Sequence, residues 1–138
     1  MIHPAMVYER DGGVFASFRD DIASIGRVRI VGHEHVRWPL VHRRDIGTLY
    51  ALALECGTPA NSYNGSSIDA VPVGVIARAI AQRAGVEPAP LIRSADEVAA
   101  QLGEWARGYA IDQRMSGDKA RCELGWTPLH TDAIADVS

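Results

Sequence analysis

The chain has 138 residues, 47% of them hydrophobic and 22% charged, and a formal net charge of −3. This is the composition of one globular domain, which at this length buries roughly two-thirds of the surface that the unfolded chain exposes. Basic and acidic residues are interspersed, so the pattern excludes the basic face expected of a nucleic-acid-binding protein.

Cysteine usage and hydropathy exclude further classes of protein. Cys56 and Cys122 lie far apart and match no metal-ligand spacing, and a chain of this size does not need a disulfide. No apolar run approaches the roughly 20 residues that cross a bilayer. The first residues lack the basic-then-apolar pattern of a signal peptide. We therefore expect a cytoplasmic protein that binds neither nucleic acid nor membrane.

The chain begins with a strand and a helix. Residues 6–8 are apolar and precede a polar segment containing glycine, which predicts a buried strand followed by a loop. Gly26 closes the helical pattern that comes next. Four large apolar residues share one face of that helix: Phe15, Phe18, Ile22 and Ile25. At this spacing the phenylalanines are interpreted as core, with a ligand-pocket role as the alternative.

Two extended stretches and an apolar helix follow. Residues 27–31 alternate between polar and apolar types and predict a strand. Residues 36–41 are also extended, but Pro39 restricts them to a sheet edge or to an irregular strand, because proline cannot donate to the ladder. Asp45 is expected to cap the next helix. Residues 46–54 are apolar almost all round, so this helix must be covered on more than one side.

The second half of the chain is richer in helix. A brief strand is predicted at residues 62–64, and a helix at residues 72–84, since proline is tolerated in a first turn. Ser94 and Glu97 have the spacing of a capping box at the start of another helix. Its apolar stripe is Val98, Leu102, Trp105 and Tyr109. With a last short helix at residues 118–124, the fold class is α/β, of α+β type, with a small sheet and about four to five helices.

Two features of a dinucleotide-binding enzyme are not found. Such an enzyme rests its cofactor's phosphates on a glycine-rich turn that opens a helix. Gly12, Gly13 and Gly57 have no further glycines at the required offsets. No tyrosine is followed by a lysine four residues later, so the acid–base pair of the short-chain dehydrogenases is missing as well. We therefore expect no catalytic residue and no metal site in this chain.

Three segments together carry a resemblance to a known family. Residues 116–128 read Ser-x-x-Lys-Ala-x-x-x-Leu-Gly-Trp-x-Pro, and residues 41–45 read Val-His-x-x-Asp ahead of the apolar helix. Residues 3–8 read His-Pro-x-x-Val-Tyr. Each resembles a segment of the extended short-chain dehydrogenases/reductases, the NAD-dependent epimerase/dehydratase family. That family has arginine at the position of His3 and glycine at the position of Glu9.

The resemblance implies a truncated Rossmann-type epimerase. Residues 1–138 are expected to form a single domain similar to the carboxyl-terminal, substrate-binding region of that family, with the amino-terminal dinucleotide-binding half absent. The family uses NAD or NADP. Because the cofactor carries the hydride chemistry, we expect this chain to bind no cofactor and to be inactive alone.

The same resemblance implies five candidate site residues. Substrate-binding roles fall on Arg37, His42 and Asn64, and cofactor-facing positions on Pro4 and Tyr8. Arg37 corresponds to an arginine that often binds the substrate's diphosphate, since a guanidinium fork matches two phosphate oxygens. The alternative is a solvated arginine at a strand end. His42 either fixes a turn by hydrogen bonds or transfers protons.

A pair of histidines raises the question of a metal. His33 and His35 are two residues apart and can present two ring nitrogens on one side of an extended segment. No third ligand lies at a recognisable spacing, so a solvated pair is the favoured interpretation.

Two functions remain open at this point. The first is the substrate-side part of an epimerase or dehydratase, binding a nucleotide sugar or a similar small molecule. The second is a non-catalytic oligomeric interaction module, or one part of an enzyme completed by a separate chain. Exposed sheet edges and apolar patches are pairing sites. We therefore expect a homo-oligomer, most simply a dimer, with residues 46–54 as its buried face.

Overall fold

The computed structural model describes residues 1–138 and contains eight strands, six α-helices and one 3-10 helix. In chain order the elements are β1 (Ile2–Pro4), β2 (Met6–Glu9), β3 (Gly12–Gly13), α1 (Ala16–Ile25), β4 (Arg29–Val31), β5 (Arg37–His42), α2 (Arg43–Cys56), β6 (Tyr63–Gly65), β7 (Ile68–Pro72), α3 (Val73–Ala84), β8 (Leu91–Arg93), α4 (Ala95–Leu102), η1 (Glu104–Ala110), α5 (Asp118–Leu124) and α6 (Ala133–Val137). The predicted fold class is confirmed.

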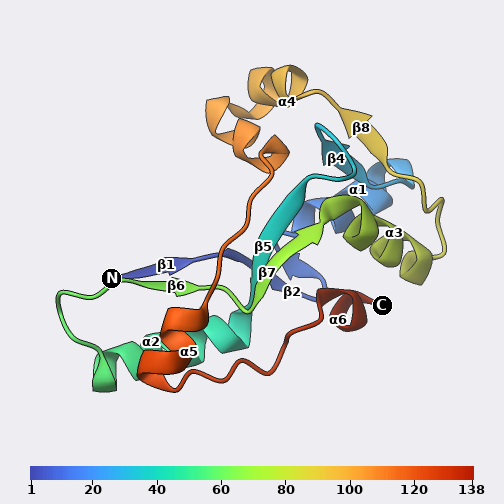
Figure 1. Cartoon of the computed structure of the whole chain (residues 1–138). Coiled ribbons are helices and arrows are strands. Elements are labelled where there is room, and N and C mark those ends of the chain that lie inside the picture. The colour runs from blue at the N-terminus through green and yellow to red at the C-terminus, as the bar shows by residue number, and fades with distance from the viewer.

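The strands form one central sheet and two small ones. The central sheet has the order β3-β2-β5-β7, with β2 parallel to β5 and the two outer pairs antiparallel. Strands β1 and β6 form a parallel pair, and so do β4 and β8. Figure 1 shows β1, β6, α2 and α5 in one lobe and β4, β8 and α4 at the far end of the other, with β5 and β7 between them.

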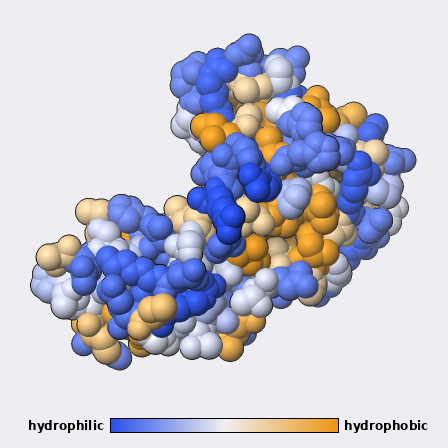
Figure 2. All heavy atoms as spheres, viewed as in Figure 1, coloured by the Kyte–Doolittle hydropathy of each residue, from blue (hydrophilic) through white to orange (hydrophobic).

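The central sheet separates two hydrophobic cores. Tyr8 and Leu40 belong to a core shared with α1, α3 and α6, whereas Val7 and Val41 pack into a second core with α2 and α5. Side chains alternate across a strand, so neighbouring residues of β2 and β5 face opposite cores. Figure 2 shows the largest hydrophobic area of one surface over β7 and α3, while hydrophilic atoms dominate both lobes.

Pro39 lies in an interior strand of the sheet, because β5 is flanked by β2 and β7. The expectation of an edge strand is therefore wrong, and the alternative of an irregular strand is correct. The pairing between β5 and β7 shifts register between Trp38 and Leu40. A register shift leaves room for a residue that has no N–H to donate.

Helix α1 follows the predicted pattern with two differences. Phe15 and Phe18 are buried, which confirms the core interpretation, but Ile25 is about half exposed at the helix end. Asp21, off the apolar face, is nevertheless buried. It accepts hydrogen bonds from the backbone N–H of Arg29 at 2.9 Å and from its Nε at 2.8 Å. This ion pair ties α1 to β4.

The cap of α2 differs from the expectation. Asp45 was expected to cap the helix, but the cap is His42, whose Nδ1 accepts a hydrogen bond from the Arg44 N–H at 3.2 Å. Asp45 lies in the first turn, where it is almost wholly buried. Its oxygens accept hydrogen bonds from the backbone N–H groups of Leu129 at 3.0 Å and His130 at 2.9 Å. Asp45 therefore fixes the carboxyl-terminal segment against α2.

The second core covers only part of α2. Ile46 and Leu49 are buried, but Tyr50 is about half exposed and Leu54 is 88% exposed. Trp126 fills this core, and its Nε1 donates to the Asp45 carbonyl oxygen at 3.0 Å. The sequence predicts that α2 is covered on more than one side, and these 138 residues do not supply that cover.

The capping box of α4 is confirmed, but the helix is shorter than predicted. The Glu97 N–H donates to Ser94 Oγ at 3.1 Å, and the Ser94 N–H donates to the Glu97 carboxylate at 3.2 Å. Gly103 ends α4 with a φ of 112°, a conformation open to glycine and costly for other residues. The chain then turns into η1, which leaves Trp105 65% exposed.

The remaining helices end as predicted. Left-handed glycines follow α1, α3 and α5, and α5 has the expected bounds. The pattern did not predict β7 or α6. No helix is both long and apolar enough to span a membrane, and Cys56 and Cys122 are exposed free thiols.

Candidate functional site

A cavity of about 310 Å³ opens between α1, β4, α4 and η1. Nine of its fifteen lining residues are hydrophobic. A concave, mainly apolar site with a few polar groups is the usual form of a small-molecule site, and this volume lies at the lower end of the usual range. Because α4 and η1 form one wall, the turn at Gly103 sets the shape of the cavity.

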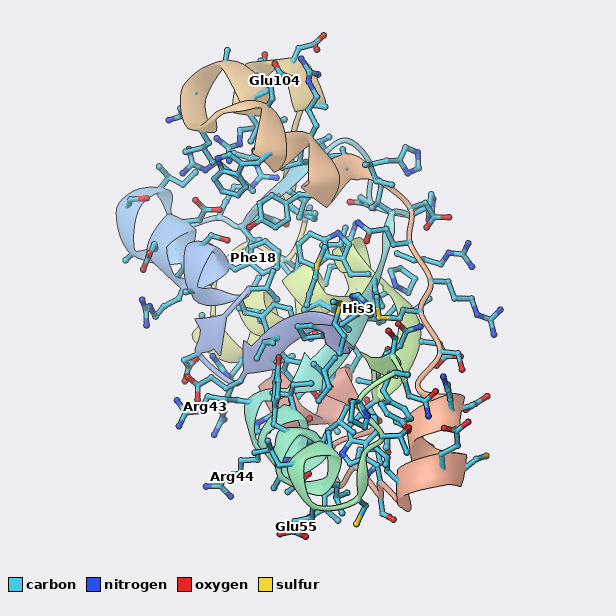
Figure 3. The ribbon with its side chains drawn as sticks, turned by 90° about the vertical axis from the view of Figure 1, so that its left-hand side faces the viewer. His3, Phe18, Arg43, Arg44, Glu55 and Glu104 are labelled. Carbon is cyan, nitrogen blue, oxygen red and sulfur yellow. The ribbon has the colours of Figure 1, made fainter.

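Four of the nine hydrophobic lining residues are aromatic. Phe18 stacks on Trp38 with ring centroids 6.1 Å apart, and Tyr109 packs against both Trp38 at 5.7 Å and Trp105 at 5.8 Å. Trp38 Nε1 donates to the Tyr109 carbonyl oxygen at 3.1 Å, which fixes the orientation of the indole. Figure 3 shows Phe18 pointing from α1 into the interior. Phe18 thus belongs to the core and also lines the cavity.

The polar groups of the cavity include a hydrogen-bond donor that no protein group satisfies. Arg93 on β8 donates through Nη1 to Gln101 Oε1 at 3.1 Å, but its Nε is buried without a partner. Buried donors are normally paired, and this one has no partner within the protein. Both residues line the cavity, as does the Asp21–Arg29 pair.

Arg37 lies outside this cavity and already has a carboxylate partner. Its Nε and Nη2 bind the two oxygens of Asp112 at 3.0 and 2.7 Å, and its backbone N–H donates to Asp112 at 2.8 Å. Hydrogen bonds from Arg37 lower the pKa of Asp112 to about 2. Both side chains are half exposed. A phosphate bound by Arg37 must therefore compete with an ionised carboxylate.

Pro4 and Asn64 lie together on the β1–β6 pair. Pro4 is in register with Gly65, and His3 with Asn64. Strand β1 pairs with β6 along one edge only. Figure 1 shows the two strands side by side at the amino-terminal end of the chain.

Tyr8 and His42 lie opposite each other in the central sheet, with ring centroids 5.3 Å apart. The Tyr8 hydroxyl donates to Asp136 Oδ2 at 2.6 Å. Burial, reinforced by Asp136, raises the pKa of Tyr8 far above its usual value, so the phenol stays protonated. Burial lowers the pKa of His42, with His130 adding to the effect. As the cap of α2, His42 fixes a turn, as predicted.

The five predicted residues therefore fall into three places. Pro4 and Asn64 share one small sheet, and Tyr8 contacts His42. Arg37 is at the other end of β5 from His42, on the order of 16 Å away at about 3.3 Å per residue. The cavity residues on β8, α4 and η1 were not predicted. The aromatic stripe at Trp105 and Tyr109 was their only signal, and it was interpreted as helix packing.

The two histidines of the 33–35 pair are linked by a local hydrogen bond. The rings of His33 and His35 are 4.8 Å apart, but His33 Nδ1 already accepts a hydrogen bond from the His35 N–H at 3.0 Å. No group of three or more His, Cys, Asp or Glu side chains is placed to hold a metal ion.

The comparisons with solved structures define the class of fold. The human epimerase family protein SDR39U1, solved with NADPH, superposes with a TM-score of 0.81 at 18% identity, covering 99% of this chain and 45% of that one. MoeE5, solved in complex with UDP-glucuronic acid and NAD, gives a TM-score of 0.69 at 18% identity, covering 98% of this chain and 44% of that one. The fold is thus one found in epimerase and short-chain dehydrogenase/reductase proteins.

Two curated fungal proteins are similar in sequence. The uncharacterized protein C2A9.02 of Schizosaccharomyces pombe is 30% identical over 102 residues, which is 73% of this chain and 34% of that protein. The uncharacterized protein YLL056C of Saccharomyces cerevisiae is 27% identical over 135 residues, or 97% of this chain and 45% of that protein. The chain spans less than half the length of either relative. No family model matches it.

Proposed function

We propose that this chain is the substrate-binding part of an NAD-dependent epimerase/dehydratase-like protein. It binds a nucleotide sugar or a similar phosphate-bearing small molecule and transfers no hydride on its own. The observation that carries the proposal is a ligand-sized aromatic cavity within a chain that matches an epimerase family protein over 99% of its length.

The cavity suits a planar ring with hydrogen-bonding edges. Stacking on aromatic side chains stabilises a bound base by about 1–3 kcal/mol. Trp105 and Tyr109 offer such faces, and the side chains of Arg93 and Gln101, which also line the cavity, offer polar groups to the edge of the ring. The base of a nucleotide sugar combines both properties. MoeE5, which has this fold, was solved with a nucleotide sugar of this kind.

Arg37 is the candidate for the diphosphate. It precedes the cavity-lining Trp38 in β5 but does not itself line the cavity. Its guanidinium is half exposed and already oriented by Asp112. A diphosphate that displaces Asp112 gains the same two-point contact that the carboxylate makes now.

The residues present do not fit the pyrophosphate of a dinucleotide cofactor. Helices α2 and α3 each follow a strand directly, which is where α/β proteins hold such a group. At α2 the Arg44 N–H donates to His42 Nδ1, and no glycine-rich turn precedes the helix to let the pyrophosphate of a dinucleotide approach the backbone. At α3 the amides of Val73 and Gly74 donate to carbonyl oxygens of the segment before β5 at 2.8 and 3.0 Å. We therefore derive no cofactor step for this chain.

A thermal-shift titration with UDP-, GDP- and dTDP-sugars tests the proposal. A ligand that binds only the folded state raises the Tm by mass action. At least one nucleotide sugar is expected to raise the Tm of the wild type, and Trp105→Ala is expected to abolish the rise. Trp105 is largely exposed, so its loss should leave the unliganded Tm near that of the wild type. Tyr50→Ala, which removes an exposed ring outside the cavity, is the matched control.

An oligomeric interaction module is the second candidate. The observation that favours it is the exposure of Leu54 and Tyr50 on α2, together with the unpaired edge of β1. Exposed apolar side chains and free strand edges are each typical of a surface that another chain covers.

A further inference from the structure

A second cavity, of about 320 Å³, lies at the start of α2 and shares no residue with the aromatic one. Its lining contains no hydrophobic residue: Glu9, Arg10, His42, Arg43, Arg44, His130 and Asp136. These side chains come from the end of β2, the start of α2 and the carboxyl-terminal segment. We propose that this cavity binds a phosphate-type oxyanion, either free phosphate or a small phosphate monoester.

The charges of the cavity leave cationic donors free. Three guanidinium groups face two carboxylates, and both carboxylates are engaged. Glu9 contacts Arg43 at 3.3 Å, and Asp136 accepts from the Tyr8 hydroxyl at 2.6 Å. The Arg44 side chain makes no hydrogen bond or ion pair, and Arg10 reaches only the carbonyl oxygen of Ser138 at 3.4 Å. Figure 3 shows Arg43 and Arg44 projecting from the start of α2 on the same side.

A stacked histidine pair adds one further hydrogen-bond donor. The rings of His42 and His130 stack with centroids 3.7 Å apart and an interplanar angle of 13°. His42 Nδ1 accepts from the Arg44 N–H, so the neutral ring carries its proton on Nε2 and can donate it to an anion. His130 Nδ1 lies 3.1 Å from Asp45 Oδ2 and donates to it, so the Nε2 of this neutral tautomer is an acceptor and His42 supplies the ring donor to the anion.

The arrangement favours an oxyanion over other ligands. Guanidinium forks match the oxygen pairs of phosphate, and charge-assisted hydrogen bonds of this kind are about twice as strong as neutral ones. The cavity offers no apolar wall for a base or a lipid tail. The three arginines of the lining outnumber its two carboxylates by one charge, and a bound oxyanion supplies the missing counter-charge.

The test uses inorganic phosphate as the probe, at constant ionic strength, followed by amide and histidine-ring NMR. Phosphate is expected to give saturable shifts at residues 43–45 and at the rings of His42 and His130. Arg44→Ala is expected to weaken binding about tenfold, the effect of losing a charge-assisted contact. Arg114→Ala, an exposed arginine paired with Asp69 elsewhere on the surface, is the control and should bind as the wild type does.

Other outcomes overturn the proposal. Shifts that grow without saturation, or that equal amounts of chloride reproduce, mean ionic screening and no site. An unchanged affinity in Arg44→Ala also contradicts it. A phosphate monoester that competes with free phosphate identifies the esterified ligand, and either source supports the site. The proposed nucleotide-sugar function is tested separately, since it depends on Trp105, which does not line this cavity.

Discussion

The buried Asp45 side chain holds the carboxyl-terminal segment against the first turn of α2. Its two oxygens accept two backbone N–H groups and face the His130 ring. Asp45→Asn keeps the shape but turns an NH₂ group toward one of those donors. We expect the free energy of unfolding to fall by about 1–3 kcal/mol, the cost of an unmatched buried donor. Urea denaturation measures it, with the exposed Asp118→Asn as a control that should change little.

Arg37 and Asp112 allow a sharp test of the diphosphate contact. Asp112→Ala frees the guanidinium, so a nucleotide sugar should raise the Tm more than it does for the wild type. Arg37→Ala should abolish the phosphate contribution. Equal Tm shifts in all three proteins would assign the phosphate contact elsewhere. The pairing itself should resist acid, because the pKa of Asp112 is lowered to about 2 and the carboxylate is lost only as the pH falls toward that value.

The residue scale also shows where a sequence pattern stops being informative. Both His42 and Asp45 suit the start of a helix, and the preference for aspartate at the cap favoured Asp45. In the structure His42 caps the helix, because the Asp45 carboxylate instead accepts hydrogen bonds from the backbone N–H groups of residues 129 and 130. Those amides are more than 80 residues away in the chain, so no local pattern contains them.

At the scale of elements, the turn between α4 and η1 shapes the aromatic cavity. Gly103 has a φ of 112°, and an added Cβ would lie 3.0 Å from the Trp105 ring. Gly103→Ala should therefore lower the free energy of unfolding by about 1–3 kcal/mol and weaken nucleotide-sugar binding. Gly108→Ala, in the same 3-10 helix and with open space around it, is the control. Equal stability of the two variants would mean that the turn tolerates a side chain.

Element prediction succeeded where the signal was local. The capping box of α4, the glycine after α1 and the bounds of α5 all follow from neighbouring residues. It failed where tertiary contacts decide. The register shift at Pro39 arises in the pairing of β5 with β7. The apolar stripe from Val98 to Tyr109 is regular in the sequence, but the helix that carries its first half ends at Gly103. The cavity was missed for the same reason, since its wall exists only because the chain turns there.

At the scale of the whole molecule, α2 leaves apolar surface uncovered. Leaving such surface in water costs about 25 cal/mol per Å², so a few hundred Å² amounts to several kcal/mol, a large part of a domain's stability. We predict that the 138-residue chain forms a homodimer, because a two-fold axis lets one patch cover its own copy. Light scattering at micromolar concentration should give twice the monomer mass.

The matched variant is Leu54→Glu, which places a charge on the most exposed apolar side chain of α2. It should shift the protein to monomer, whereas Ile92→Glu, at an exposed position on β8 in the other lobe, should not. A wild type that stays monomeric would contradict the dimer and leave α2 to be covered by other residues or by another protein.

The central claim is that this chain binds the substrate and does not bind the cofactor, and calorimetric titration of the 138-residue chain tests it most directly. A nucleotide sugar should give a saturable heat that Trp105→Ala removes. NAD and NADPH should give no tight, stoichiometric binding, because the chain has no glycine-rich turn to receive the pyrophosphate. Tight one-to-one binding of either cofactor, with no response to nucleotide sugars, would contradict the account.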